Sequence, residues 1–167
     1  SINRERKEVT VRELDTGVEE PVAYDKLILS PGASPIVPDL PGGKSDRVLT
    51  LRNVADMDAI KKLVDGAPEG RALVIGGGYV GLEMAEALRN RGAPVMLVEL
   101  AEQVMAPVDP EIASPLHRQL VQHGVDLRLG TRVVSFRDAP DGVVAELSTG
   151  ETVECAFAVM AIGVKPE

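Results

Sequence analysis

Ala72-Leu-Val-Ile-Gly-Gly-Gly-Tyr-Val-Gly-Leu-Glu83 is the stretch of sequence that decides the fold. It begins with a short apolar run, passes into a cluster of glycines, and continues as a pattern typical of a helix. Gly76, Gly78 and Gly81 have the G-x-G-x-x-G spacing of a turn that binds a dinucleotide. The spacing alone is weak evidence, but the strand before it and the helix after it supply the context that this motif requires.

Each glycine of this motif has a physical role in binding a pyrophosphate. Gly76 allows the tight turn, Gly78 lets the backbone approach the pyrophosphate, and Gly81 lets the helix pack against its strand. The helix is expected over Tyr79–Arg91, with Gly92 as its stop signal. Its first turn offers free backbone N–H groups and about half a unit of positive charge, so the pyrophosphate is expected there.

An acidic residue follows the next apolar run at the place where a ribose is expected. Val95–Val98 ends in Glu99, 18 residues after Gly81, and a carboxylate there binds both hydroxyls of the adenosine ribose. The alternative is a solvated glutamate at a strand end. A 2′-phosphate at about 4 Å from this carboxylate would be repelled by about 4 kcal/mol at an effective dielectric of about 20. No Lys or Arg lies between Glu99 and Pro115, so the sequence favours NAD(H) over NADP(H).

Composition excludes several classes of function. The 167 residues suit one ordinary domain, and a hydrophobic fraction of 44% is typical of globular proteins. The net charge of −8 argues against a nucleic-acid partner and an anionic membrane surface. No apolar stretch approaches the roughly 20 residues of a membrane span. A single cysteine, Cys155, cannot form an internal disulfide and fits a reducing cytoplasm. His117 and His123 stand apart, so no metal site is expected and both are interpreted as helix-surface residues.

The first 43 residues are expected to form a small β structure followed by a connecting segment. Residues 8–14 alternate as a half-buried strand does, and residues 20–24 are placed to return antiparallel after a turn. Leu27–Leu29 is a candidate for a short buried strand. Residues 31–43 are rich in proline and glycine, which indicates a linker or a loop crossing a domain border.

Helices and strands alternate after this segment. Asn53 is placed to cap a helix, and Asp109 with Pro110 is placed to begin another. Pro115 leaves open a restart of that second helix at Ser114-Pro115, because an interior proline removes a hydrogen bond. Residues 125–129 then read as a short strand.

The C-terminal third changes to an antiparallel pattern. Three alternating runs, 132–136, 143–147 and 152–155, are separated by turn signals and predict a β-meander. The apolar run Phe157–Ile162, which ends at Gly163, suits a central parallel strand covered on both faces. The expected fold class is α/β, a Rossmann-like doubly wound parallel sheet with an antiparallel β-meander insertion, in three layers.

Three motifs in this order resemble those of the flavoprotein pyridine nucleotide-disulfide oxidoreductases. They are Tyr24-Asp-Lys-Leu-Ile-Leu-Ser-Pro-Gly-Ala33, the Gly76–Glu83 fingerprint and Ala161-Ile-Gly-Val-Lys-Pro166. The run Gly78–Glu86, together with the segment Glu99–Asp109, is most similar to the coenzyme A-disulfide reductase and NADH oxidase/peroxidase branch. The resemblance implies a remnant of an FAD domain over 1–43, an NAD(H)-binding domain over 44–163, and a return to the FAD domain over 164–167.

The resemblance also implies roles for individual residues. Tyr79 matches an aromatic gate over the flavin, and Glu83 matches a carboxylate near the nicotinamide carboxamide. Val80 joins the glycines in cofactor binding, and Gly163 contributes backbone at the nicotinamide end. The plainer readings stay open: a half-buried ring for Tyr79, a solvent-facing carboxylate for Glu83 and a strand-ending glycine for Gly163.

The implied function is that of an NAD(H)-binding part of a larger FAD enzyme. Its redox thiol, FAD fingerprint and dimerisation domain would belong to segments outside these residues, so no catalytic residue is expected here. Cys155 lacks a nearby Lys, Arg or His in sequence and is expected to be a buried structural cysteine. The implied partners are the rest of a homodimeric parent and a disulfide or oxygen-type substrate. The alternatives are a non-catalytic NAD-sensing module, a lipoamide-dehydrogenase-type reductase, and a self-contained dehydrogenase, for which no catalytic set is found.

Overall fold

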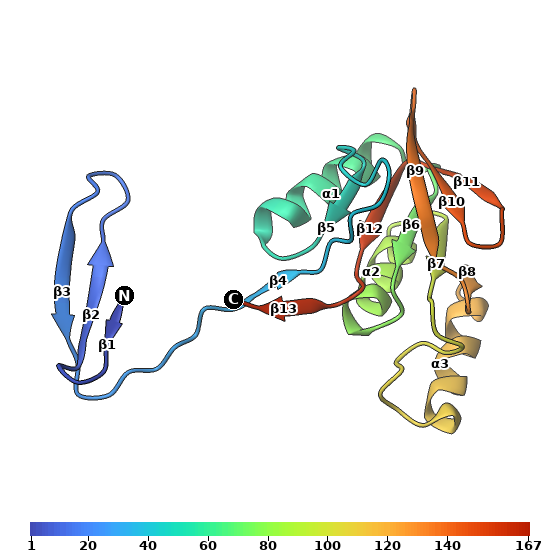
Figure 1. Ribbon diagram of the computed structural model, residues 1–167. Helices are drawn as coiled ribbons and strands as arrows, with labels where there is room; N and C mark the ends of the chain where they lie inside the picture. Colours follow the sequence, from blue (N-terminus) through green and yellow to red (C-terminus); the bar gives the residue numbers. More distant parts are fainter. The chain divides into compact units, whose positions relative to one another are not determined.

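The computed structural model describes residues 1–167, which divide into two compact units, Ser1–Gly32 and Ala33–Glu167 (Figure 1). The first unit is a three-stranded antiparallel sheet of β1 (Ile2–Asn3), β2 (Glu8–Arg12) and β3 (Glu19–Ala23). Val9 pairs with Val22, and the turn between β2 and β3 contains Gly17 at a φ of 71°. The predicted hairpin is therefore confirmed.

The predicted buried strand at Leu27–Leu29 is wrong. These residues form no strand, and Ile28 is 87% exposed. A strand requires a neighbour for its backbone groups and an apolar surface for its side chains. Within these 167 residues no other strand pairs with this segment, so its apolar composition alone does not make it a strand.

The second unit is built on a five-stranded parallel sheet. Its order is β5 (Val48–Thr50), β12 (Phe157–Met160), β6 (Ala72–Ile75), β7 (Val95–Val98) and β8 (Val125–Arg128). All residues of β6, β7 and β12 are buried, as expected for parallel strands covered on both faces. The α/β class is confirmed, and β12, the apolar run predicted as a central parallel strand, lies inside the sheet between β5 and β6.

One face of this sheet is covered by helices α1 (Val54–Gly66), α2 (Tyr79–Asn90) and α3 (Pro110–Gln122). Asn53 and Asp56 form a capping box at the start of α1, which confirms the predicted cap. Helix α3 runs through Pro115 without a restart. Pro115 is the sixth residue of the helix, so it removes one interior hydrogen bond, the one that would run to Glu111 O, and the helix continues past it.

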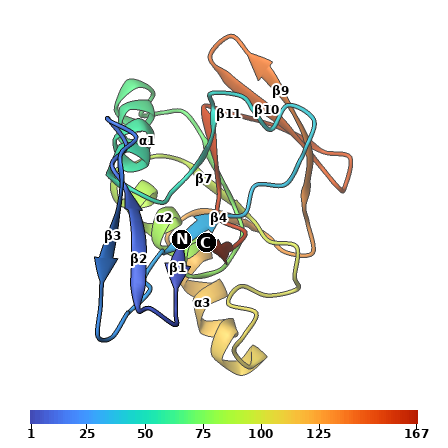
Figure 2. The same cartoon turned by 60° about the vertical axis from the view of Figure 1, so that its left-hand side comes forward.

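The opposite face is covered by the meander of β9 (Val133–Ala139), β10 (Gly142–Leu147) and β11 (Thr152–Cys155). Figures 1 and 2 show it on the side of the sheet away from the helices. The three layers are thus helices, parallel sheet and meander, so strands take the place that a second helical layer has in other doubly wound folds.

The two ends of the second unit pair with each other. β4 (Ala33–Pro35) and β13 (Val164–Pro166) form an antiparallel ribbon, and Ile36 N donates to Gly163 O at 2.9 Å. Arg52 contacts both Ser34 and Glu167, which ties the ribbon to the start of α1. The two strands of this ribbon lie at the two expected inter-domain crossings, so the ribbon holds these two crossings beside each other.

Candidate functional site

The chain turns at Gly76 where β6 ends. Gly76 has a φ of 107°, and a Cβ at this position would lie 2.4 Å from the carbonyl oxygen of Ala161. Its N–H donates to Val98 O at 2.8 Å. Only glycine fits this backbone conformation so close to the neighbouring chain.

Helix α2 begins directly after this turn. Gly78 is its N-cap residue and supplies no side-chain cap, and a Cβ there would meet no atom within 4 Å. A Cβ at Gly81 would lie 1.9 Å from Gly76 O, so this glycine permits the close approach of helix and turn. The helix start therefore presents open space beside backbone N–H groups, an arrangement that suits an anion.

Glu99 follows β7 and its carboxylate reaches the glycine turn. Oε2 accepts the N–H of Gly77 at 2.5 Å, and Oε1 accepts the N–H of Ala101 at 2.7 Å. The side chain is half-buried. Two backbone donors fix the carboxylate beside the turn, where its remaining lone pairs can accept further hydrogen bonds.

These elements open into a cleft of about 770 Å³ at the carboxyl ends of β6, β7 and β12. In open α/β sheets, ligands bind in the crevice outside the carboxyl ends of the strands, at the point where the order of the strands reverses. Six of the eight residues predicted for the site line the cleft: Gly76, Gly78, Tyr79, Val80, Glu99 and Gly163. Gly81 is buried behind it, under the turn.

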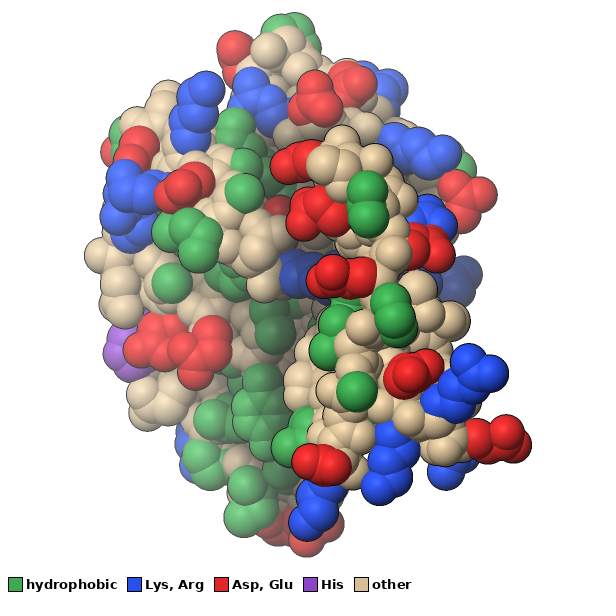
Figure 3. Space-filling model, turned by 90° about the vertical axis from the view of Figure 1, so that its left-hand side faces the viewer, with side chains coloured by type: hydrophobic (Ala, Val, Ile, Leu, Met, Phe, Trp, Pro, Cys, Tyr) green, Lys and Arg blue, Asp and Glu red, His purple; other side chains and the backbone are tan.

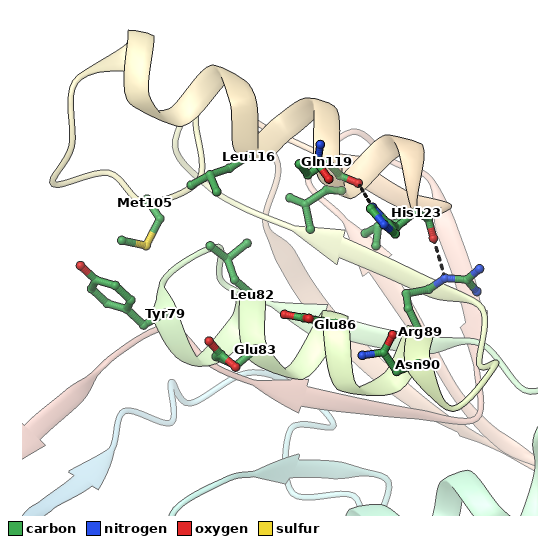
Figure 4. Close-up of a pocket in the computed structure, with 12 residues that line it drawn as sticks. Tyr79, Leu82, Glu83, Glu86, Arg89, Asn90, Met105, Leu116, Gln119 and His123 are labelled. Carbon is green, nitrogen blue, oxygen red and sulfur yellow. Dashed lines mark hydrogen bonds between the residues drawn. The ribbon is translucent and has the colours of Figure 1, made fainter.

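The eighth residue, Glu83, lies in a different groove. That groove has a volume of about 660 Å³ and runs between α2 and α3 (Figure 4). Leu82 and Leu116 point toward each other across it, and Glu83 and Glu86 lie along α2. Tyr79 is 73% exposed and lines both the groove and the cleft.

Further cleft residues were not predicted individually, although four of them lie in the segments Glu99–Asp109 and Ala161–Pro166 that carry the family resemblance. They are Ala106, Pro107, Thr131, Arg132, Ala161 and Ile162. Thr131 and Arg132 lie at the cleft beside Glu99, since Thr131 N donates to Glu99 O at 2.9 Å. The position of these residues just after parallel strands is the signal that would have indicated them.

The expectation that both histidines are helix-surface residues holds for one of them only. His123 is exposed at the end of α3, where Nδ1 lies 2.8 Å from Gln119 O. His117 is half-buried, and its Nε2 accepts the N–H of Val104 at 3.1 Å. A backbone donor from a separate loop is not visible in a helical pattern, so this contact could not be predicted from the residues of α3.

Cys155 is buried, as predicted, and Sγ donates to Val143 O at 3.3 Å. Burial raises the pKa of its thiol from 9.0 to about 12, and the nearby charge of Arg71 offsets only part of this. A thiol with such a pKa is protonated at neutral pH and is a poor nucleophile. Cys155 therefore has a structural role in this chain.

The surface carries charges of both signs. On the face shown in Figure 3, acidic and basic side chains are interspersed. No helix of the structure combines the length and the apolar character that crossing a membrane requires.

Comparison with known proteins identifies related sequences over the whole chain. The family described as pyridine nucleotide-disulphide oxidoreductase matches residues 1–167. NADH oxidase of Enterococcus faecalis is 34% identical over 167 residues, which cover 99% of this chain and 37% of that protein. Coenzyme A disulfide reductase of Staphylococcus haemolyticus is 37% identical over 138 residues, which cover 83% of this chain and 31% of the relative.

A solved relative contains the expected cofactor. The water-forming NADH oxidase from Lactobacillus brevis bound to NADH superposes with a TM-score of 0.82 at 36% identity, over 100% of this chain and 37% of that one. An FAD-dependent pyridine nucleotide-disulphide oxidoreductase from Desulfovibrio vulgaris superposes with a TM-score of 0.79 at 27% identity, over 99% of this chain and 42% of that one. The chain spans about a third of the length of these curated relatives.

Proposed function

Because this chain belongs to the pyridine nucleotide-disulphide oxidoreductase family, we propose that it is the NAD(H)-binding domain of a larger FAD-dependent enzyme. The parent is of the coenzyme A-disulfide reductase or NADH oxidase type. It is a cytoplasmic homodimer whose electrons pass from NADH through the flavin to a cysteine centre. Residues 44–163 form the binding domain, and residues 1–43 and 164–167 belong with the FAD domain.

The observation that carries this proposal is the Glu99 carboxylate held beside the glycine turn at the cleft. Open space at Gly78 and the free N–H groups at the start of α2 suit a diphosphate. The carboxylate suits the paired hydroxyls of a ribose. Groups complementary to the diphosphate and to the ribose of a dinucleotide therefore lie in one cleft.

The residues of this chain bind and orient the cofactor, which supplies a hydride when bound. Glu99 accepts the ribose hydroxyls and disfavours a 2′-phosphate by charge repulsion. The exposed ring of Tyr79 lies where the cleft meets the α2–α3 groove, a position suited to a gate over the flavin. Glu83, one helical turn further along α2, contacts the nicotinamide end once the parent domains are assembled.

Calorimetry on the 167-residue chain tests this function. We expect NADH to bind, NADPH to bind more weakly, and FAD to give no heat of binding. Followed at the absorbance of NADH, the chain alone should oxidise no cofactor when a disulfide is added. Sustained oxidation without flavin, or equal affinity for NADH and NADPH, would refute the proposal.

A further inference from the structure

The loop between Glu99 and helix α3 lies against the glycine turn. Met105 N donates to Gly77 O at 2.8 Å, and the Val104 side chain is fully buried. Side-chain atoms of Val104 come within 2.9 Å of a Cβ built at Gly77, so the loop packs tightly on the turn. Gly77 is therefore held on both sides: its N–H by Glu99 and its carbonyl by Met105.

This loop conformation needs support from elsewhere. Met105 has a φ of 52°, in the left-handed region that residues with side chains seldom occupy. Such a strained conformation persists only where surrounding contacts determine it. The hydrogen bond from Val104 N to His117 Nε2, at 3.1 Å, is such a contact, made at the preceding peptide.

The contact also defines the state of His117. Nε2 accepts a hydrogen bond only when it carries no proton, so the ring is the neutral tautomer protonated at Nδ1. Helix α3 supplies the acceptor from 13 residues further along the chain. The two successive N–H groups of Val104 and Met105 thus point to α3 and to the glycine turn respectively.

We propose that His117 is a positioning residue of the dinucleotide site, acting through Val104 and Met105 to hold the Gly77 peptide in its binding conformation. The inference rests on the proposed function, because the affinity that His117 influences is that for NAD(H). His117 itself lies outside the residues that line the cleft. Its effect is to remove the freedom of the loop before the ligand arrives, and so to lower the entropy lost on binding.

Substitutions that differ in acceptor ability test this role. His117→Leu removes the acceptor, while His117→Gln places an amide oxygen at about the position of Nε2. We expect His117→Leu to weaken NADH binding by about 3- to 10-fold, the effect of one lost hydrogen bond. His117→Gln should restore affinity to within about twofold of the unsubstituted chain, and Val104 amide exchange should accelerate in the leucine variant only.

The matched control is His123→Leu at the end of the same helix, since the His123 side chain is exposed and hydrogen-bonds only Gln119 O, while Arg89 binds its backbone carbonyl. It should leave NADH affinity unchanged. If His117→Leu fails to fold by thermal denaturation, His117→Asn takes its place, because its shorter side chain cannot reach Val104 N. Unchanged affinity in a folded leucine or asparagine variant would overturn the inference, as would a glutamine variant as weak as leucine. An unsubstituted chain that binds no NADH would instead overturn the proposed function.

Discussion

The carboxylate of Glu99 accepts the backbone N–H of Gly77, with 2.5 Å between Oε2 and N. The residue that the sequence assigns to the ribose thus also holds the glycine turn. The two tasks are compatible because each carboxylate oxygen has two lone pairs, of which the backbone uses one. The glycine turn and the proposed ribose acceptor are therefore a single structural unit.

Replacing Glu99 by Ala should weaken NADH binding by about 1–3 kcal/mol, because ribose hydroxyls and the Gly77 N–H lose their acceptor. The preference for NADH over NADPH should narrow, since the repulsion of a 2′-phosphate is removed. Calorimetry with both cofactors measures these effects. Glu154→Ala, which removes an exposed carboxylate from β11, is the control for net charge. Unchanged affinity for both cofactors would remove Glu99 from the site.

Gly76→Ala should destabilise the fold. The positive φ of 107° and the 2.4 Å approach to Ala161 O oppose any side chain here. We expect the free energy of unfolding to fall by at least about 1–3 kcal/mol in urea denaturation. Gly66→Ala, at the last residue of α1 with no atom within 4 Å, should instead leave it unchanged or raise it by up to about 0.5 kcal/mol. Equal effects of the two substitutions would contradict the described turn.

Gly78→Ala should leave stability nearly unchanged and weaken cofactor binding. Its φ of −81° suits alanine, and nothing in the protein occupies the space beside it. A methyl group there would keep a diphosphate away from the N–H groups of α2, and each charged hydrogen bond lost costs about 1.5–3 kcal/mol. Denaturation and NADH titration of the same variant separate the two effects. Full NADH affinity in this variant would place the diphosphate elsewhere.

The stability of the chain should fall at alkaline pH through Cys155. Its folded-state pKa of about 12 lies above the ordinary value of 9.0, so folding favours the protonated thiol. The contribution of this thiol to the free energy of unfolding is fully present below pH 9. It is lost progressively between pH 9 and about 12, at about 1.4 kcal/mol per pH unit. Comparing denaturation of the chain and of Cys155→Ala across this range isolates the effect. An identical pH slope in both would contradict it.

The sequence predicted elements whose signals are local. The apolar runs of β6, β7 and β12, the turn at Gly76 and the cap at Asn53 each depend on neighbouring residues, and the structure has them all. Strand β5 was not predicted because three residues are too few to show a period. Leu27–Leu29 has the composition of a strand but no pairing partner.

Contacts between distant segments could not be predicted. The bond from Val104 N to His117 joins a loop to a helix face, and neither side has a distinctive pattern. Thr131 and Arg132 reach the cleft only through the order of strands in the sheet. Glu83 shares a helix with Tyr79, yet lies in the α2–α3 groove and not in the cleft, a separation that helical spacing alone does not reveal.

Amide chemical shifts of the ¹⁵N-labelled chain during titration with NADH test the central claim most directly. Binding at the glycine turn should produce the largest shifts at Gly76–Tyr79 and at Glu99–Ala101. Residues of the α2–α3 groove near His123 should change little. A folded chain whose spectrum does not respond to NADH, or responds only in that groove, would contradict the account.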